Sequence, residues 1–134
     1  METKVTTAKE IEDSVREIVA ETLAVGPDEV VPSARFFEDL GGESIDLLDL
    51  SFRCEKQFGV KIPFADLGRL DEFPTDSDGK LTADALAHLE TKYPFLDYAR
   101  LREDPHLSRL TEMLTVENIT RFVQCAMAEQ AKAR

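Results

Sequence analysis

The first apolar pattern of the chain has the spacing of a helix with one buried face. Thr7 stands three residues before Glu10, as in a capping box, so we expect the helix to begin there. Gly26 and Pro27 predict its end, because glycine suits the left-handed C-cap and proline breaks a helix. The predicted apolar face comprises Ile11, Val15, Ile18, Val19 and Leu23.

Residues 27–43 show no helical pattern and predict a loop. It is longer than most connections in compact domains, and long loops usually have a function. A loop of this length can cross a helical bundle and bring the residues after it to the far end. We expect its apolar residues to anchor it; they are Val30, Val31, Phe36, Phe37 and Leu40.

A second helix is predicted from Ser44 to about Phe58. Gly41 and Gly42 permit a sharply turning approach, and Ser44 is predicted to be the N-cap. The free N–H groups and the positive dipole end of a helix start favour a phosphate. The inward stripe is predicted to be Leu47, Leu50, Cys54 and Phe58, with Ile45, Leu48 and Phe52 beside it.

The later part of the chain predicts two further helices. One is capped by Thr82 and runs through Lys92, before Tyr93-Pro94 ends it, and the other begins after Thr115. Residues 64–113 contain too many apolar side chains for a free linker, so we expect this segment to pack as a cap on the rest of the protein. The residues concerned are Leu81, Leu86, Leu89, Phe95, Leu96 and Leu107.

The string from Phe36 to Pro63 resembles the acyl carrier protein family. Its centre reads Asp39-Leu40-Gly41-Gly42-Glu43-Ser44-Ile45-Asp46, where the family has Leu-Gly-Gly or Leu-Gly-Ala before Asp-Ser-Leu. The resemblance covers roughly residues 5–63 and 114–127, which makes 64–113 an insertion. It implies an all-α, acyl-carrier-like four-helix bundle that forms a single carrier domain over residues 1–134. The helical insertion then replaces or extends the third segment.

The resemblance also implies the chemistry. Ser44 would bear covalent 4′-phosphopantetheine, attached by a phosphopantetheinyl transferase. The chain would then carry acyl intermediates as thioesters in fatty-acid, polyketide or related lipid biosynthesis, between acyl-loading and acyl-processing enzymes with basic docking patches. The implied partner-recognition positions are Glu43, Asp46, Asp49, Phe52 and Glu55. The candidates for an acyl pocket are Phe36, Leu48, Phe52, Cys54 and Ile62. Arg53 and Lys56 depart from the family pattern, which has a neutral residue and an acid there.

Charge and composition narrow the classes of partner. The 134 residues have a net charge of −11 and a pI near 4.6, which argues against nucleic acid and anionic membrane surfaces. No run is long and apolar enough to span a bilayer. The two cysteines form no CxxC motif and the histidines are not paired, which predicts a cytoplasmic protein without a metal site. We expect a monomer.

Enzymatic activity is not expected. The string Gly42-Glu43-Ser44-Ile45-Asp46 lacks the second glycine of a nucleophile elbow, and both histidines lie in the insertion. Two alternatives to an acyl carrier stay open. Gly41-Gly42 is mildly suggestive of an aminoacyl or peptidyl carrier in non-ribosomal synthesis. The second alternative is an unmodified helical interaction protein, in which Ser44 would be only a helix cap.

Overall fold

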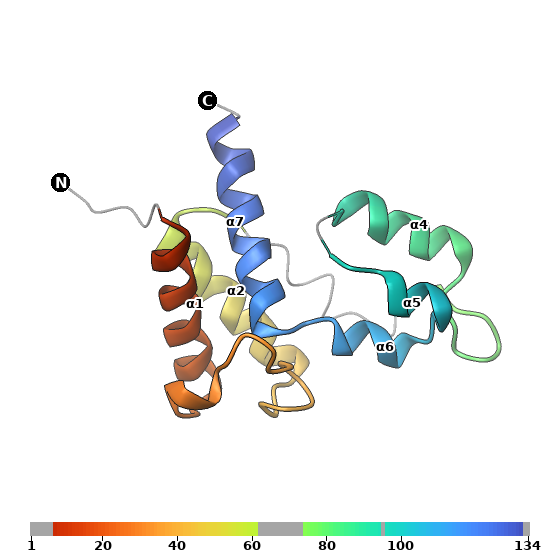
Figure 1. Ribbon diagram of the computed structural model, residues 1–134, viewed down its shortest axis with the longest axis horizontal. Helices are drawn as coiled ribbons and strands as arrows, with labels where there is room; N and C mark the ends of the chain where they lie inside the picture. Colours follow the sequence, from red (N-terminus) through yellow and green to blue (C-terminus); the bar gives the residue numbers. More distant parts are fainter. Residues whose placement is uncertain (1–6, 62–73, 95, 133–134) are drawn as a thin grey trace.

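The computed structural model describes residues 7–61, 74–94 and 96–132, and this part of the chain is helical (Figure 1). Isolated β-bridges are its only strand pairing, so the expected all-α fold is confirmed for these residues. The helices are α1 (Ala8–Leu23), the 3₁₀ turn η1 (Pro27–Glu29), α2 (Ser44–Phe58), α4 (Ala83–Lys92), α5 (Ala99–Glu103), α6 (Leu107–Glu112) and α7 (Val116–Lys132).

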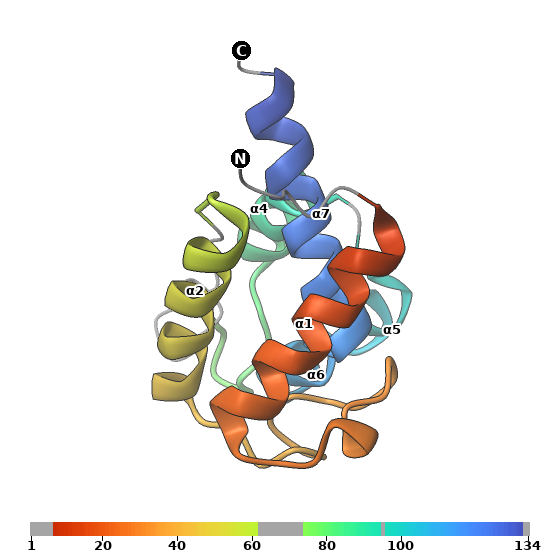
Figure 2. The same cartoon turned by 90° about the vertical axis from the view of Figure 1, so that its left-hand side faces the viewer.

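Helix α1 packs against both α2 and α7, and together these three form the bundle (Figure 2). The predicted inward stripe of α2 is confirmed, because all four of its residues are buried. The apolar stripe of α1 is buried apart from Leu23, which packs against the core while partly exposed. The last turns of α7 project beyond the ends of α1 and α2 (Figure 1). None of the helices described is both long and apolar enough to cross a membrane.

The two ends of α1 differ in how well the sequence predicts them. The capping box is confirmed, because Thr7 Oγ1 accepts from the Glu10 N–H and the Glu10 carboxylate accepts from the Thr7 N–H. The predicted glycine C-cap is wrong: Ala24 takes the left-handed conformation, with φ 56°. Its cost of about 1–2 kcal/mol is offset by two bonds, since the N–H groups of Ala24 and Val25 both donate to the Ala20 carbonyl. Gly26 instead precedes η1, where Pro27 is the first residue.

The insertion has its own hydrogen-bonded framework. Thr82 caps α4 by accepting from the Ala85 N–H at 3.2 Å, which confirms that prediction. The Tyr98 hydroxyl lies 2.8 Å from the carbonyl oxygens of both Leu89 and Tyr93, so it fastens the end of α4 to the start of α5. An ion pair between Arg102 and Glu90, at 2.8 Å, links the same two helices.

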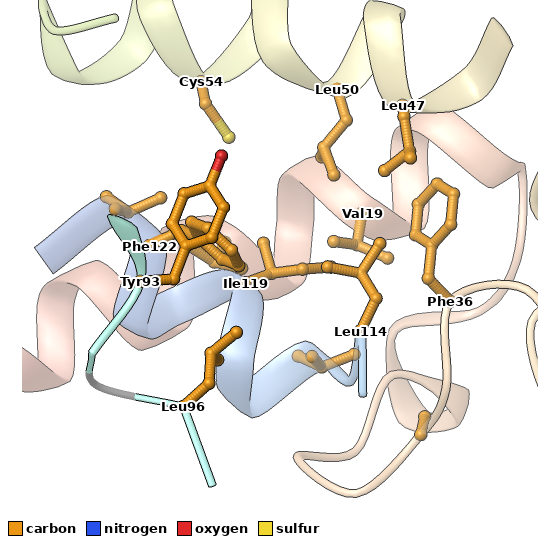
Figure 3. Packing of buried hydrophobic residues seen from close by; sticks show 14 of the residues in the cluster. Val19, Phe36, Leu47, Leu50, Cys54, Tyr93, Leu96, Leu114, Ile119 and Phe122 are labelled. Carbon is orange, nitrogen blue, oxygen red and sulfur yellow. The ribbon is translucent and has the colours of Figure 1, made fainter. Parts of the chain in front are cut away.

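The insertion packs on the bundle through the segment after α4. The Tyr93 ring meets the Phe122 ring of α7 edge-on, with centroids 5.0 Å apart, and Leu96 lies in the same apolar cluster (Figure 3). The expected burial is therefore confirmed for Leu81, Leu89 and Leu96, while Leu86 is half-buried against the core. Phe95 and the side chain of Leu107 lie outside the described residues.

Candidate functional site

The loop from residue 30 to residue 43 leads into α2 and is anchored by apolar contacts. Val30, Phe36 and Leu40 are buried, and Phe37 packs edge-on against Phe36 at 5.3 Å. Val31 was expected to be a further anchor, but it is 44 % exposed, so that prediction is wrong. The loop carries fewer apolar anchors than its sequence suggests.

Backbone hydrogen bonds join this loop to the residues at the start of α7. The Phe36 N–H donates to the Leu114 carbonyl and the Val116 N–H donates to the Ala34 carbonyl, each at 2.9 Å. The Glu117 N–H also donates to the Pro32 carbonyl at 2.9 Å. The segment that closes the insertion therefore fixes the path of the chain toward Ser44.

A side-chain pair tightens the turn before the glycines. The Asp39 carboxylate accepts from the Arg35 backbone N–H at 2.8 Å and from two guanidinium nitrogens at 3.1 Å. These contacts with Arg35 lower the pKa of Asp39 and raise that of Arg35. Glu38 beside it accepts from the Thr111 hydroxyl at 2.8 Å. Sequence reasoning missed this pair, because i,i+4 spacing indicates a contact on a helix and residues 27–43 are predicted to be a loop.

Gly41 and Gly42 are needed for different reasons. Gly41 has φ +75°, a conformation that residues with a Cβ rarely adopt. Gly42 lies against the Phe36 ring, and a Cβ at this position would stand 2.4 Å from Phe36 Cε2. The buried phenyl ring thus occupies the space that a side chain at residue 42 would need, and the backbone passes directly over it.

The N-cap of helix α2 is one residue earlier than predicted. Ser44 is the first helical residue, and Glu43, with extended backbone, is the N-cap. The Asp46 carboxylate accepts from the Glu43 N–H at 2.9 Å, which is the bond that the third helical residue makes in a capping box. Glu43 and Ile45, on either side of Ser44, are both exposed.

The predicted recognition residues lie along the outer side of α2, but two of the acids are already engaged. Asp46 caps the helix, and Asp49 forms an ion pair with Arg53 at 3.3 Å. Arg53 also lies 3.6 Å from Glu21 of α1. Glu43 is exposed, Glu55 is partly buried and Phe52 is 62 % exposed, in keeping with an apolar surface contact.

The structure does not bring the acyl-pocket candidates together. Phe36 and Cys54 are completely buried, whereas Leu48 and Phe52 face outward and are about half and 62 % exposed. Ile62 lies outside the described residues. An acyl-pocket role for these residues stays a prediction.

Cys54 is buried beneath α2, with the Tyr93 hydroxyl pointing toward its sulfur (Figure 3). Burial raises the pKa of the Cys54 thiol to about 12, so the thiol is protonated at neutral pH. A buried, protonated thiol behaves as a small apolar core group rather than as a nucleophile. Sequence reasoning gave no sign that the insertion supplies its tyrosine neighbour.

Comparison with known proteins identifies the family. Residues 13–75 match the family model described as the phosphopantetheine attachment site. An acyl carrier protein of Thermosynechococcus vestitus is 48% identical over 54 residues, which are 40% of this chain and 67% of the relative. Those of Zymomonas mobilis and a Sulfurovum species are each 45% identical over 51 residues, 38% of this chain and 65% and 68% of those proteins. The chain belongs to the acyl carrier protein family.

The cofactor of acyl carrier proteins is 4′-phosphopantetheine, and the start of α2 fits it. The first N–H groups of a helix have no acceptor within the helix, and its dipole is positive there, so a phosphodiester is favoured. The exposed Glu43 and Ile45 leave room for an arm in solvent. The family model ends at residue 75, so it does not test the resemblance of α7 to the last helix of acyl carrier proteins or the limits of the insertion.

Proposed function

We propose that Ser44 is the residue that carries 4′-phosphopantetheine in this acyl carrier protein. The observation that carries the proposal is position: Ser44 is the first residue of α2, between the exposed Glu43 and Ile45, inside the range that matches the attachment-site family. The loop that leads to it is held by the Arg35–Asp39 pair and by the Phe36–Leu114 bond, which supports a fixed start of α2 relative to the bundle.

The electrostatics of this position support esterification by a phosphate group. A helix N-terminus favours a nearby anion by about 0.3–1 kcal/mol at an exposed site. Glu43 and Asp46 oppose this, but the carboxylate of Asp46 is directed at the Glu43 N–H. When the arm is bound, its terminal thiol supplies the group that holds an acyl chain as a thioester.

We further propose that the cargo is an acyl intermediate of fatty-acid, polyketide or related lipid biosynthesis. The relatives named above are all acyl carrier proteins, which favours acyl over aminoacyl or peptidyl cargo. In this proposal the chain is a substrate of other enzymes and not itself an enzyme. Its partners are a phosphopantetheinyl transferase and acyl-loading and acyl-processing enzymes. Neither Cys54 nor Cys125 forms a disulfide, in keeping with a reducing cytoplasm.

An intact-mass measurement tests the attachment site. The protein is incubated with coenzyme A and a broad-specificity phosphopantetheinyl transferase. Wild type is expected to gain one phosphopantetheine and Ser44→Ala none. The matched control is Ser33→Ala, because Ser33 is exposed and also lies within the matched range. It should be modified like wild type.

Folding must be separated from loss of the hydroxyl. Because Ser44 is not the N-cap, Ser44→Ala is expected to cost less than the roughly 1 kcal/mol of a lost cap. Circular dichroism and urea unfolding should therefore show an intact protein. A variant that lacks Ser44 but still gains the arm, mapped by peptide analysis to another residue, would overturn the assignment.

A further inference from the structure

The last helix of the insertion, α6, lies beside the loop that precedes Ser44. Besides the three backbone bonds that join this loop to the start of α7, Arg35 and Thr115 form an isolated antiparallel bridge. Helix α6 ends at Glu112, so these contacts begin directly after it. A displacement of α6 would therefore also displace the backbone to which the loop is bonded.

The turn between α6 and α7 is a firm support for the loop. The Asn118 side-chain amide donates to the Met113 carbonyl at 2.6 Å, and the Thr115 N–H donates to the same oxygen at 3.0 Å. Thr115 Oγ1 accepts in return from the Asn118 N–H at 3.1 Å. The Leu114 carbonyl, which accepts from the Phe36 N–H, lies inside this turn. These bonds hold the end of α6 and the start of α7 in one arrangement.

One side chain of α6 extends this support toward Ser44. The Thr111 hydroxyl lies 2.8 Å from the Glu38 carboxylate and 2.8 Å from the Ser108 carbonyl. Its single hydrogen can be donated to only one acceptor at a time, and a carboxylate is the stronger acceptor of the two. Thr111 is half-buried. The insertion thus contacts the loop through a side chain as well as through the backbone that follows it.

The charges around this contact show that the end of α6 and the loop share one polar cluster. Asp39 raises the pKa of Arg35 most, through its hydrogen bond to the guanidinium. Glu38 and Glu112 raise it further, so both carboxylates lie near the same guanidinium. Arg109 of α6 pairs with Glu112 at 3.2 Å.

From Glu38 the support reaches the start of α2 without interruption. Glu38 belongs to a compact turn over residues 35–42, and the last four N–H groups of this turn all donate to carbonyls within it. Only Glu43, the N-cap of α2, separates the turn from Ser44. Because the turn is closed by its own bonds, a force on the Glu38 side chain moves the turn as a unit.

We propose that Thr111 is a positioning residue for the attachment of phosphopantetheine at Ser44. Its hydrogen bond to Glu38 lets the insertion hold the turn before α2, so that Ser44 is presented to the transferase in a fixed position. The inference rests on the proposed attachment at Ser44. It gives a role in the modification to a residue beyond residue 75, where the match to the attachment-site family ends.

The chemistry explains why position matters. The Ser44 oxygen forms a bond to phosphorus while the pyrophosphate bond of coenzyme A breaks. Adenosine bisphosphate leaves and the serine proton is released. The rate of such a displacement depends on the alignment of the attacking oxygen, and a misplacement of about 1 Å can slow a reaction by about 10²-fold.

The test follows attachment of the arm to the full-length protein by intact mass, with saturating coenzyme A, a broad-specificity transferase and varied concentrations of the carrier. Thr111→Val removes the hydroxyl and nearly keeps the shape of the side chain. It should lower kcat by about two- to tenfold, the range that one hydrogen bond supplies, and leave KM nearly unchanged. Thr111→Ser keeps the hydroxyl and should restore the wild-type kcat.

Two further comparisons isolate the bond to Glu38. In a Glu38→Ala background, Thr111→Val should have no additional effect, because the two residues share one interaction. Amide hydrogen exchange over residues 39–42 should quicken in Thr111→Val, while exchange in α1 stays the same. The matched control is Thr91→Val, which changes an exposed threonine of α4 and should react like wild type.

The proposal fails if Thr111→Val reacts like wild type or if Thr111→Ser is as slow as Thr111→Val. It also fails if KM rises while kcat is unchanged, since Thr111 would then contact the transferase directly. A loss that persists in the Glu38→Ala background would assign the effect to α6 alone. Peptide mapping of the modified wild type separates these outcomes from failure of the proposed function: an arm on a residue other than Ser44 would overturn both.

Discussion

The turn before Ser44 depends on two adjacent glycines whose replacement should have unequal effects. At Gly41 the obstacle is the left-handed backbone, and a Cβ there would meet open space. Gly41→Ala should therefore cost about 1–2 kcal/mol of unfolding free energy. At Gly42 the obstacle is the buried Phe36 ring, which cannot turn aside without disturbing the core. Gly42→Ala should cost about 1–3 kcal/mol.

The two variants differ most in their effect on modification. Moving the Phe36 ring would also disturb its backbone bond to Leu114, so Gly42→Ala should slow phosphopantetheine attachment more than Gly41→Ala does. Urea unfolding gives the stabilities, and the rate of mass gain gives the second comparison. If the double change Gly42→Ala with Phe36→Leu were no faster than Gly42→Ala alone, contact with the ring would not be the cause.

Tyr98 gives the insertion a pH dependence at high pH. Its hydroxyl is buried between two carbonyls, and this burial raises its pKa from 10.0 to about 12. The phenol must be protonated in the folded state, so its contribution to stability is complete below pH 10 and is lost as the pH rises toward 12. Tyr98→Phe should cost about 1 kcal/mol at neutral pH. The stability of the Tyr98→Phe variant should then fall less steeply than that of wild type above pH 10. Parallel curves from thermal melts would contradict this.

At the scale of single elements, the outer surface of α2 has fewer carboxylates available to a partner than its sequence suggests. Arg53 lies within ion-pair distance of Asp49 and Glu21, and Asp46 is occupied by the helix cap. The same side exposes Ile45, Leu48 and Phe52, at positions i, i+3 and i+7. We therefore expect contacts with enzymes to combine apolar burial with a smaller electrostatic contribution than a count of carboxylates would give.

The ion pair on α2 makes this expectation testable. Asp49→Asn with Glu55→Gln should slow attachment of the arm at low salt, because fewer charges attract a basic transferase. Arg53→Gln should speed it, because Asp49 and Glu21 are released. Both differences should shrink when the salt is raised, since exposed charges are screened. The measurement is the initial rate of arm attachment at two salt concentrations, with helicity checked by circular dichroism. If the variants and wild type react at equal rates at low salt, the acids serve only solubility.

The helix ends also show which features the sequence can predict. The caps at Thr7, Thr82 and Thr115 follow from local chemistry, and each side chain accepts from the backbone N–H three residues later. Ala24 was missed because the cost of a left-handed alanine is offset by bonds that only the folded helix end provides. Ser44 was misassigned because Glu43 was not weighed as a cap with Asp46 as its partner. Loop bonds such as Phe36 to Leu114 join residues far apart in sequence, and no local pattern indicates them.

At the scale of the whole molecule, Tyr93 connects the insertion with the bundle. It is 3% exposed, stacks edge-on against Phe122, and points its hydroxyl toward Cys54 of α2 (Figure 3). An insertion residue is buried in the same cluster as Leu50 and Ile119, so we expect the two parts to depend on each other for stability. The sequence predicts only that the apolar residues of the insertion must be buried, because no pattern in it indicates which residue enters the bundle.

Replacing Tyr93 should therefore destabilise both the insertion and the bundle. Tyr93→Ala leaves a cavity and should cost about 3–5 kcal/mol, as for other large aromatic side chains in cores. Amide hydrogen exchange should quicken in α4 and also in the turns of α2 and α7 around Cys54 and Phe122. His88→Ala is the matched control, because His88 is an exposed residue of α4, and it should leave exchange in the bundle unchanged. Faster exchange confined to α4 would mean that the insertion folds beside the bundle without supporting it. Faster exchange that reaches α2 would mean that the cap and the helix that begins at Ser44 unfold as one unit.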